Sequence, residues 1–272
     1  MIVCRSAAEL ERMQEAGRLV AEVLTELASV VAPGVTTADL DRLAEERIRQ
    51  AGAVPAFLGY HGYPATICAS VNDEVIHGIP SPSRVLVEGD IISIDVGAEL
   101  AGYFGDSAIT LPVGKVSEEA ATLLRVTDES LYKAIEQVRP GGRISDIGHA
   151  VQEHVEAHGF SVVREFVGHG IGQQMHEEPQ IPNYGPRGRG PRLAEGMVLA
   201  IEPMVNAGRA AVKVLADGWT AVTRDGSLAA HFEHTVAVTS GEPWILTART
   251  PAAGASRTDG ERQGAAVVPR VP

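Results

Sequence analysis

Apolar residues recur at helical spacing in four stretches of the chain, and these stretches form two pairs. The first pair covers residues 6–31 and 37–51, and a Pro-Gly dipeptide separates its members. The second pair covers residues 117–138 and 145–158 and is divided by Pro-Gly again. Because Pro and Gly stop helices, the pattern predicts two pairs of consecutive helices.

Short apolar runs outside the helices predict β-strands. Residues 66–71 form one such run, and residues 72–82 are predicted to be a loop that carries His77. A further apolar run ends in Asp95, and Asp106 follows on a second short strand after a glycine-containing turn. The sequence therefore places two carboxylates on one apolar hairpin.

One ungapped offset relates the two halves of the chain. A shift of 107 residues, from the first Pro-Gly to the second, also aligns the second helix of each pair. The same shift carries the strand that ends in Asp95 onto an apolar strand that ends in Glu202. We interpret this as a duplication, with half-repeats of about residues 5–112 and 113–245 that supply carboxylates to a shared cleft.

The second half completes a set of four carboxylates. After Glu202 the chain passes through a hairpin that contains Trp219, and Glu233 then begins an apolar strand. Glu233 is expected to stand opposite Glu202, as the two aspartates of the first hairpin face each other. Bare charges are costly to bury, so such carboxylates are normally neutralised, paired or bound to a cation. The alternative is that the aspartates lie in solvent at strand ends.

A histidine in a glycine-rich segment is the candidate nitrogen ligand. His169 lies in Val-Gly-His-Gly-Ile-Gly, residues 167–172, where the glycines allow close backbone approach. The segment lacks the Lys-Ser/Thr of a phosphate-binding loop and the glycine spacing of a dinucleotide motif. An oxygen-rich set with one imidazole suits divalent Mn, Co, Fe or Zn. A lone histidine is more often a packed core or surface residue, so this assignment depends on the carboxylates.

Composition and charge narrow the classes of function. A net charge of −12 argues against a protein that tracks nucleic-acid phosphates. No apolar run approaches the roughly 18 residues that span a bilayer, and the N-terminus lacks the basic and apolar segments of a signal peptide. Cys4 and Cys68 are too few for a disulfide or zinc framework, so a reducing cytoplasm is the expected location.

Short motifs that contain the acids and histidines are spread over about residues 3–245. They are Ser-Val-Asn-Asp-Glu-Val-Ile-His-Gly-Ile-Pro from Ser70, Ile-Asp-Val-Gly from Ile94, Gly105-Asp106, Gly-His-Gly-Ile-Gly from Gly168, His-Glu-Glu-Pro from His176, Ile-Glu-Pro from Ile201 and Glu-His-Thr from Glu233. In this order they resemble the type I methionine aminopeptidases. The resemblance implies an α/β (α+β) pita-bread fold, with two pseudo-twofold-related half-domains and a central curved antiparallel sheet flanked by helices.

The resemblance also implies a site with two divalent metal ions, of Co, Mn, Fe or Zn. The implied metal ligands are Asp95, Asp106, His169, Glu202 and Glu233. Asp106 and Glu233 would bridge the two ions. His77 and His176 would be catalytic histidines that also contact the substrate. A water shared by the ions would attack the scissile carbonyl, with Glu202 as the general base.

The implied reaction is removal of the initiator methionine from nascent proteins and peptides. The partners would be N-terminal Met peptides at the ribosome, and the enzyme is expected to be a monomer that binds neither nucleic acid nor membrane. By resemblance, the residues that line the methionine pocket are Tyr60, Tyr63, Cys68, Met175 and Trp219. The alternative interpretation of these side chains is ordinary core packing.

Two other functions stay open. Prolidases and Xaa-Pro aminopeptidases share the implied ligands, although they usually carry an additional N-terminal domain. A catalytically silent protein of the same fold would bind peptides or partners. Such proteins typically lose ligands, whereas this sequence has all of them.

The remaining histidines receive no role in the predicted site. His154 and His158 are spaced i, i+4 on the fourth predicted helix, and we interpret them as part of a solvated face. His231 and His234 flank Glu233 and are expected to point away from its side.

The last residues differ in composition from the rest. Beyond about residue 247, Ala, Pro, Gly, Arg and Thr dominate and apolar periodicity is lost. Residues 1–247 are therefore predicted to form a single catalytic domain, and residues 248–272 a disordered tail.

Overall fold

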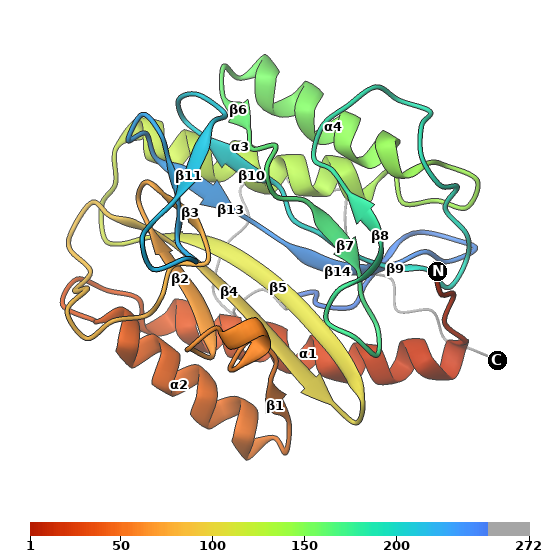
Figure 1. Ribbon diagram of the computed structural model, residues 1–272, viewed down its shortest axis with the longest axis horizontal. Helices are drawn as coiled ribbons and strands as arrows, with labels where there is room; N and C mark the ends of the chain where they lie inside the picture. The colour runs from red at the N-terminus through yellow and green to blue at the C-terminus, as the bar shows by residue number, and fades with distance from the viewer. Residues whose placement is uncertain (250–272) are drawn as a thin grey trace, which may run out of the picture.

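Helices and antiparallel strands alternate along the chain (Figure 1). The structure is a computed structural model that describes residues 1–249. Its helices are α1 (Ala7–Val30), α2 (Thr37–Gln50), α3 (Glu118–Ile135) and α4 (Ile144–Ala157), with a short 3₁₀ turn, η1 (Tyr60–Gly62). All of the predicted helices are confirmed, with ends that differ by a few residues.

Antiparallel pairing arranges the strands of the described chain in four sheets. The first contains β1 (Val54–Pro55), β2 (Ile67–Val71), β4 (Ile91–Leu100) and β5 (Tyr103–Pro112). The second contains β6 (Ser161–Val162), β10 (Met204–Asn206) and β13 (Ala229–His231). The third contains β3 (Glu74–Ile76), β11 (Val212–Val214) and β12 (Ala221–Thr223). The fourth contains β7 (Gly168–Gly170), β8 (Glu177–Ile181), β9 (Val198–Ile201), β14 (His234–Ala237) and β15 (Trp244–Ile245).

Two predictions about strands are wrong in detail. The predicted loop 72–82 contains β3, whose pairing partner β12 comes from the other half of the chain, so the local pattern could not indicate it. The hairpin strands are also longer than expected. Asp95 lies in the middle of β4, because the strand continues to Leu100, and β5 is ten residues long.

The 107-residue offset reappears in the structure. α4 begins and ends 107 residues after α2. An isolated bridge joins Thr36 to Val85, and a second bridge at the same offset joins Arg143 to Arg192. In Figure 1, α1 and α2 lie below the long β4–β5 hairpin, whereas α3 and α4 lie above it. The two halves thus repeat both their helices and the contacts that anchor them.

Side-chain hydroxyls join β5 of the first half to the second half. The Thr110 hydroxyl donates to the His231 carbonyl and accepts from the His231 N–H, both at 2.8 Å. The Ser107 hydroxyl donates to the Glu233 carbonyl at 2.6 Å, and Thr235 exchanges hydrogen bonds with the backbone of β5. Ser107, Thr110 and Thr235 are all buried, and we call this set the hydroxyl seam.

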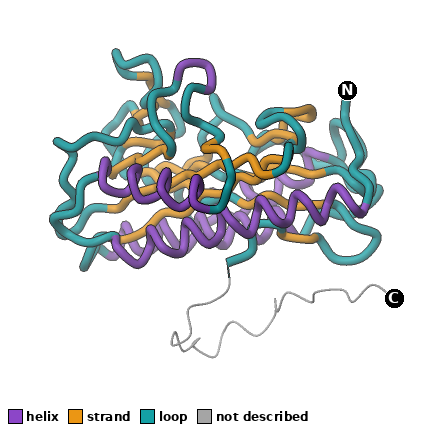
Figure 2. The backbone as a smooth tube through the Cα atoms, turned by 90° about the horizontal axis from the view of Figure 1, so that it is seen from below, coloured by secondary structure: helices purple, strands orange, loops and turns teal. Residues whose placement is uncertain are grey.

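The main core lies between the helices and the strands and includes side chains from both halves. Figure 2 shows helices running across one side of the strands. Within residues 1–249, no helix is long and apolar enough to cross a membrane. Of the predicted tail, all but its first two residues lie outside the described chain.

A close backbone contact fixes α1 against β5. A Cβ atom at Gly105 would lie 2.8 Å from the Gly17 nitrogen, closer than van der Waals contact allows. Since the obstructing atoms belong to backbone, neither side can give way by changing a rotamer. Position 105 therefore needs glycine for packing against α1. Gly17 is needed for a separate reason, because a Cβ atom there would lie 2.5 Å from the Leu246 carbonyl oxygen.

Gly105→Ala should lower the free energy of unfolding by about 1–3 kcal/mol, because it forces α1 away from β5. Urea unfolding followed by circular dichroism measures this. Gly241→Ala is the matched control, because its added Cβ would meet only Thr239 Oγ1 at 3.9 Å. Equal stability of the two variants would show that the contact is not tight.

Candidate metal centre

The two aspartates of the first half point to the same face of the β4–β5 hairpin. Asp95 pairs with Ala108 and Asp106 pairs with Gly97, so the two acids are diagonal neighbours rather than directly opposite. Directly opposite and diagonal residues of an antiparallel pair share a face. The predicted hairpin with two aspartates is present, and the two aspartates are offset by two residues in its pairing register.

The two glutamates of the second half are directly opposite each other. Glu202 follows β9 and Glu233 precedes β14, and the adjacent pair is Ile201 with His234. The hydroxyl seam then brings Glu233 to β5, where its backbone N–H donates to the Ala108 carbonyl at 2.9 Å. The acids of both halves therefore meet in one cleft.

His169 enters this cleft from β7. Its Nδ1 donates to the Gly170 carbonyl at 2.9 Å, which leaves Nε2 free to face the acids. Nε2 lies 3.8 Å from Asp106 Oδ2 and 3.7 Å from Glu202 Oε1. Metal-binding histidines usually donate their other ring N–H in this way. Potential ligand atoms of Asp106, His169 and Glu233 lie within 4.8 Å of one another.

The donor set fits a divalent cation. Asp95 Oδ1, Asp106 Oδ1 and Glu233 Oε1 are buried and have no hydrogen-bond partner among the described residues. Unpaired buried carboxylate oxygens are costly, and a cation satisfies several of them at once. Oxygen ligands with one imidazole suit Mn, Co, Fe or Zn.

Burial and mutual repulsion weaken the acids of the metal-free cleft. Burial raises the pKa of Asp95 to about 7. Burial and neighbouring carboxylates raise the pKa values of Asp106, Glu202 and Glu233 well above their ordinary range. Without a cation, the cleft therefore holds protons near neutral pH.

The two predicted catalytic histidines flank the cleft. The His176 ring lies 4.2 Å from the His169 ring between centroids, and its Nδ1 lies 2.8 Å from the Tyr60 hydroxyl. His77 follows β3 with a left-handed backbone (φ 59°), and its ring meets Phe166 edge to face. Burial lowers the pKa of His77 to about 4, so its imidazole is neutral at pH 7.

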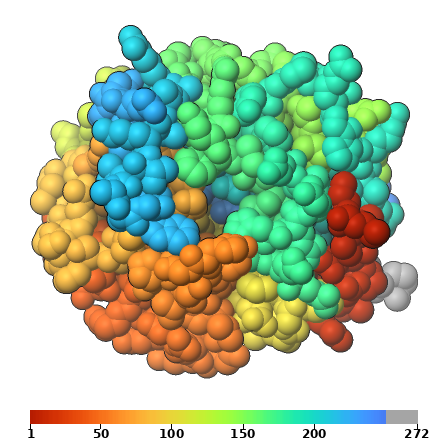
Figure 3. All heavy atoms as spheres, viewed as in Figure 1, coloured from red at the N-terminus to blue at the C-terminus, as the bar shows by residue number. Residues whose placement is uncertain are grey.

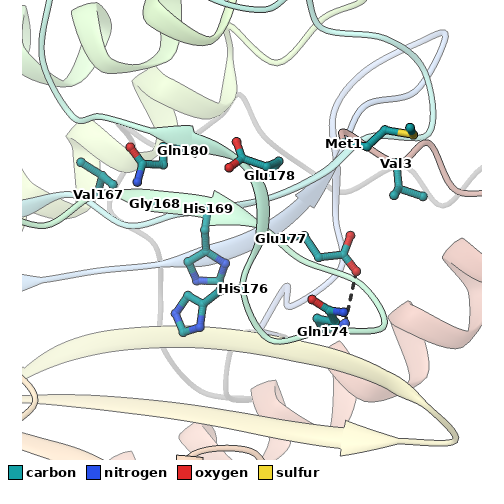
Figure 4. A pocket seen from close by; sticks show the side chains of 10 residues that line it. All are labelled: Met1, Val3, Val167, Gly168, His169, Gln174, His176, Glu177, Glu178 and Gln180. Atoms are coloured by element: carbon teal, nitrogen blue, oxygen red, sulfur yellow. Dashed lines mark hydrogen bonds between the residues drawn. The ribbon is translucent and has the colours of Figure 1, made fainter. Parts of the chain in front are cut away.

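A cavity of about 560 Å³ opens beside His169 and His176. Figure 4 shows their rings pointing toward each other from β7 and from the loop before β8. Figure 3, viewed as in Figure 1, shows a hollow near the centre of the molecule between segments drawn in orange, blue and green.

The structure brings the predicted pocket residues into one apolar cluster. Its buried and half-buried members from the prediction are Tyr60, Tyr63, Cys68, Met175 and Trp219. The Tyr63 and Trp219 rings meet edge to face at 5.1 Å. Cys68 pairs directly with Asp95 in the β2–β4 register, so the cluster adjoins the acids. Sequence reasoning missed Phe57 and Ala65, which belong to the same cluster.

His231 is a buried neighbour of the cleft that sequence reasoning assigned wrongly. Its Nε2 lies 3.8 Å from Glu202 Oε2 and has no hydrogen-bond partner in the described chain. In an extended chain, side chains two positions apart point to the same side. His231 lies two positions before Glu233, so the sequence could have indicated that both face the cleft. His234 does point away, since its Nδ1 lies 2.9 Å from the Thr247 hydroxyl.

An ion pair anchors the segment that carries His176. Buried Arg5 donates to both carboxylate oxygens of Glu177 at 2.5 Å, and Glu177 accepts from the backbone N–H groups of Gln173 and Gln174. The N-terminal segment thus holds the loop at the rim of the cavity. Nothing in the local sequence around Arg5 indicates this partner.

Comparison with known proteins shows the family to which the chain belongs. The family model described as metallopeptidase family M24 matches residues 11–240, and the chain belongs to this family. Its relatives include methionine aminopeptidase 1 of Bacillus subtilis, 58% identical over 91% of this chain and 99% of the relative. The methionine aminopeptidase of Escherichia coli is 47% identical over 91% and 94%.

Solved structures place the chain in the same group. The crystal structure of methionine aminopeptidase from Thermotoga maritima has a TM-score of 0.90 and 50% identity, and covers 91% of this chain and 99% of its own. Prolidase from Pyrococcus furiosus, at 22% identity and a TM-score of 0.75, shares the fold; this chain covers 66% of it. The predicted pita-bread fold is confirmed by these neighbours.

A bound metal ion should abolish the loss of folding stability that the acids of the cleft cause as pH rises. The acids of the cleft have higher pKa values in the folded chain than in the unfolded chain, so their protonation stabilises the folded chain at low pH. This contribution is lost as pH rises from about 4 through about 7 and above. Burial lowers the pKa values of His169 and His231 to about 3. The effect of these histidines on stability has the opposite sign, because it destabilises the folded chain as pH falls, but it acts only below about pH 6.5. Above pH 6.5 only the acids contribute, so stability should fall.

Thermal unfolding between pH 6.5 and 8.5 tests this, with chelator and with Mn²⁺. The melting temperature should decline in chelator and stay nearly constant in Mn²⁺, because the cation replaces the protons. Asp95→Asn should reduce the decline in chelator. A melting temperature that is independent of pH in chelator would contradict the expectation.

Proposed function

We propose that the protein is a methionyl aminopeptidase that removes the initiator methionine from nascent proteins and peptides. The observation that carries this proposal is the position of the apolar cluster directly beside the acid cleft, through the Cys68–Asp95 pair. A methionine side chain needs an apolar recess with polarisable neighbours, and its scissile amide must reach the reacting groups. The names of the relatives point to the same activity.

The proposed metal ligands are those implied by the sequence: Asp95, Asp106, His169, Glu202 and Glu233. Four acids in one cleft favour two divalent ions, which these residues would hold, with Co, Mn, Fe or Zn as candidates. Such ions would lower the pKa of water and polarise the scissile carbonyl.

The remaining steps belong to side chains of this chain. Glu202 is the proposed general base, because its carboxylate lies in the cleft, 3.7 Å from His169 Nε2, and a carboxylate there can accept a proton from water. His176, which lines the cavity, would donate a hydrogen bond to the carbonyl oxygen as charge develops there. His77 would hydrogen-bond the scissile amide. Tyr60, Tyr63, Cys68, Met175 and Trp219 would hold the methionine side chain.

The surroundings of the reaction follow from this proposal. Residues 1–247 would act as one catalytic domain, a monomer in the cytoplasm that meets N-terminal Met peptides as they leave the ribosome. The net charge of −12 disfavours contact with nucleic-acid phosphates, so the growing chain itself would be the partner.

Substrate preference separates the proposal from a proline-specific enzyme of the same fold. The chain loaded with Mn²⁺ or Co²⁺ should hydrolyse Met-Ala-Ser with a kcat/KM at least tenfold above that for Ala-Pro, because the apolar recess takes the methionine side chain. Release of free amino acid, followed by chromatography, measures both rates. A preference for the proline peptide would identify a prolidase-like enzyme instead.

Glu202→Gln should lower kcat on Met-Ala-Ser by roughly 10²–10⁴-fold, because the amide cannot accept the proton. Glu99→Gln, four residues after Asp95 on β4 and not one of the proposed ligands, should keep full activity. Circular dichroism checks that both variants fold. Retention of most of the activity by Glu202→Gln would refute its role as base.

A further inference from the structure

A second cluster of potential metal ligands lies on the outer helices, separate from the cleft. Glu129 comes from α3, whereas His154 and His158 come from the last turn and the end of α4. One potential ligand atom from each lies within 4.8 Å of the others. His154 Nε2 is 3.0 Å from Glu129 Oε2, so the cluster connects the two helices.

The orientation of His158 suits metal binding. His158 Nδ1 donates to the His154 carbonyl at 2.8 Å, which leaves its Nε2 with a lone pair for a ligand. This is the arrangement seen in metal-binding histidines, and the same one that orients His169 in the cleft. The two rings are 4.6 Å apart between centroids, as expected for an i, i+4 pair that points to one side of a helix.

The electrostatic setting favours a cation at this place. α4 ends at Ala157, so its C-terminal carbonyl groups and the negative end of its dipole lie beside both histidines. Partial burial raises the pKa of Glu129, but hydrogen bonds from Arg125 and His154 outweigh it and lower the pKa. Glu129 is therefore an ionised carboxylate at neutral pH.

Arg125 is the competing feature of the cluster. Its Nη1 lies 2.8 Å and 2.9 Å from the two carboxylate oxygens of Glu129. An ion would have to share this carboxylate with the guanidinium or displace it. Both side chains are partly exposed, so the ion pair is easily exchanged.

We propose that Glu129, His154 and His158 bind one divalent transition-metal ion, such as Zn²⁺, and thereby link α3 to α4. We call this three-residue site the clasp. Two imidazoles and one carboxylate, with water in the fourth position, form a common zinc donor set. The ion would replace the hydrogen bond between His154 and Glu129 with coordination bonds and would stabilise the folded chain by mass action. The clasp does not depend on the proposed peptidase activity.

Zn²⁺ titration of the chelator-treated full chain by isothermal calorimetry tests the clasp. His158→Gln should remove one equivalent of bound Zn²⁺ or weaken it by roughly 10–100-fold, and reduce the Zn²⁺-induced rise in melting temperature. Its hydrolysis of Met-Ala-Ser in Mn²⁺ should equal that of the unmodified chain. His149→Gln is the matched control, because His149 lies on the same helix and its Nδ1 faces the Gly185 carbonyl instead.

Arg125→Gln provides the opposite change. Removal of the competing guanidinium should tighten the peripheral Zn²⁺ equivalent by several-fold, and the cleft should be unaffected. Zn²⁺ binding that is identical in the unmodified chain, His158→Gln and His149→Gln would overturn the proposal. Weaker binding in Arg125→Gln would also overturn it, because Glu129 would then not be a ligand.

Discussion

The hydroxyl seam is the interaction on which the metal centre depends. Ser107 and Thr110 lie just beyond Asp106 on β5, and Thr235 lies two residues after Glu233. The seam therefore fixes the distance between acids that come from different halves of the chain. Because its hydrogen bonds involve backbone groups of His231, Glu233 and Asp106, they replace the strand ladder that β5 and the second half lack at this edge.

The acids of the cleft destabilise the folded chain, although they are the groups that could bind metal ions. Four acids and a neutral histidine occupy a buried space, and three of the carboxylate oxygens have no hydrogen bond from the described chain. A core built only for stability would replace them with apolar groups. The arrangement makes sense for a protein that folds around cations, which is consistent with membership in metallopeptidase family M24.

The two halves have kept the same frame and acquired different side chains. α2 and α4 and their anchoring bridges repeat at one offset, and the same offset relates Asp95, within β4, to Glu202, directly after β9. The second half alone adds His169, His176 and His231 around the acids. The first half contributes most of the apolar cluster beside them, including Tyr63 and Cys68. The cleft thus combines a repeated scaffold with an asymmetric set of functional groups.

The sequence alone determined the helices, the repeat and the set of acids, because helical periodicity, Pro-Gly stops and acids in apolar strands are local signals. The family motifs added His77, His169, His176 and the apolar cluster, which the structure brings together. Strand β3, the stagger of Asp95 against Asp106, and the Arg5–Glu177 pair required the tertiary structure. β3 and Arg5 each depend on a partner that lies far away along the chain, whereas the stagger depends on the pairing register of the β4–β5 hairpin. The prediction for His231 was wrong for a different reason. Its two-residue spacing from Glu233 was a local signal that both side chains share one side of an extended chain, and the prediction did not use it.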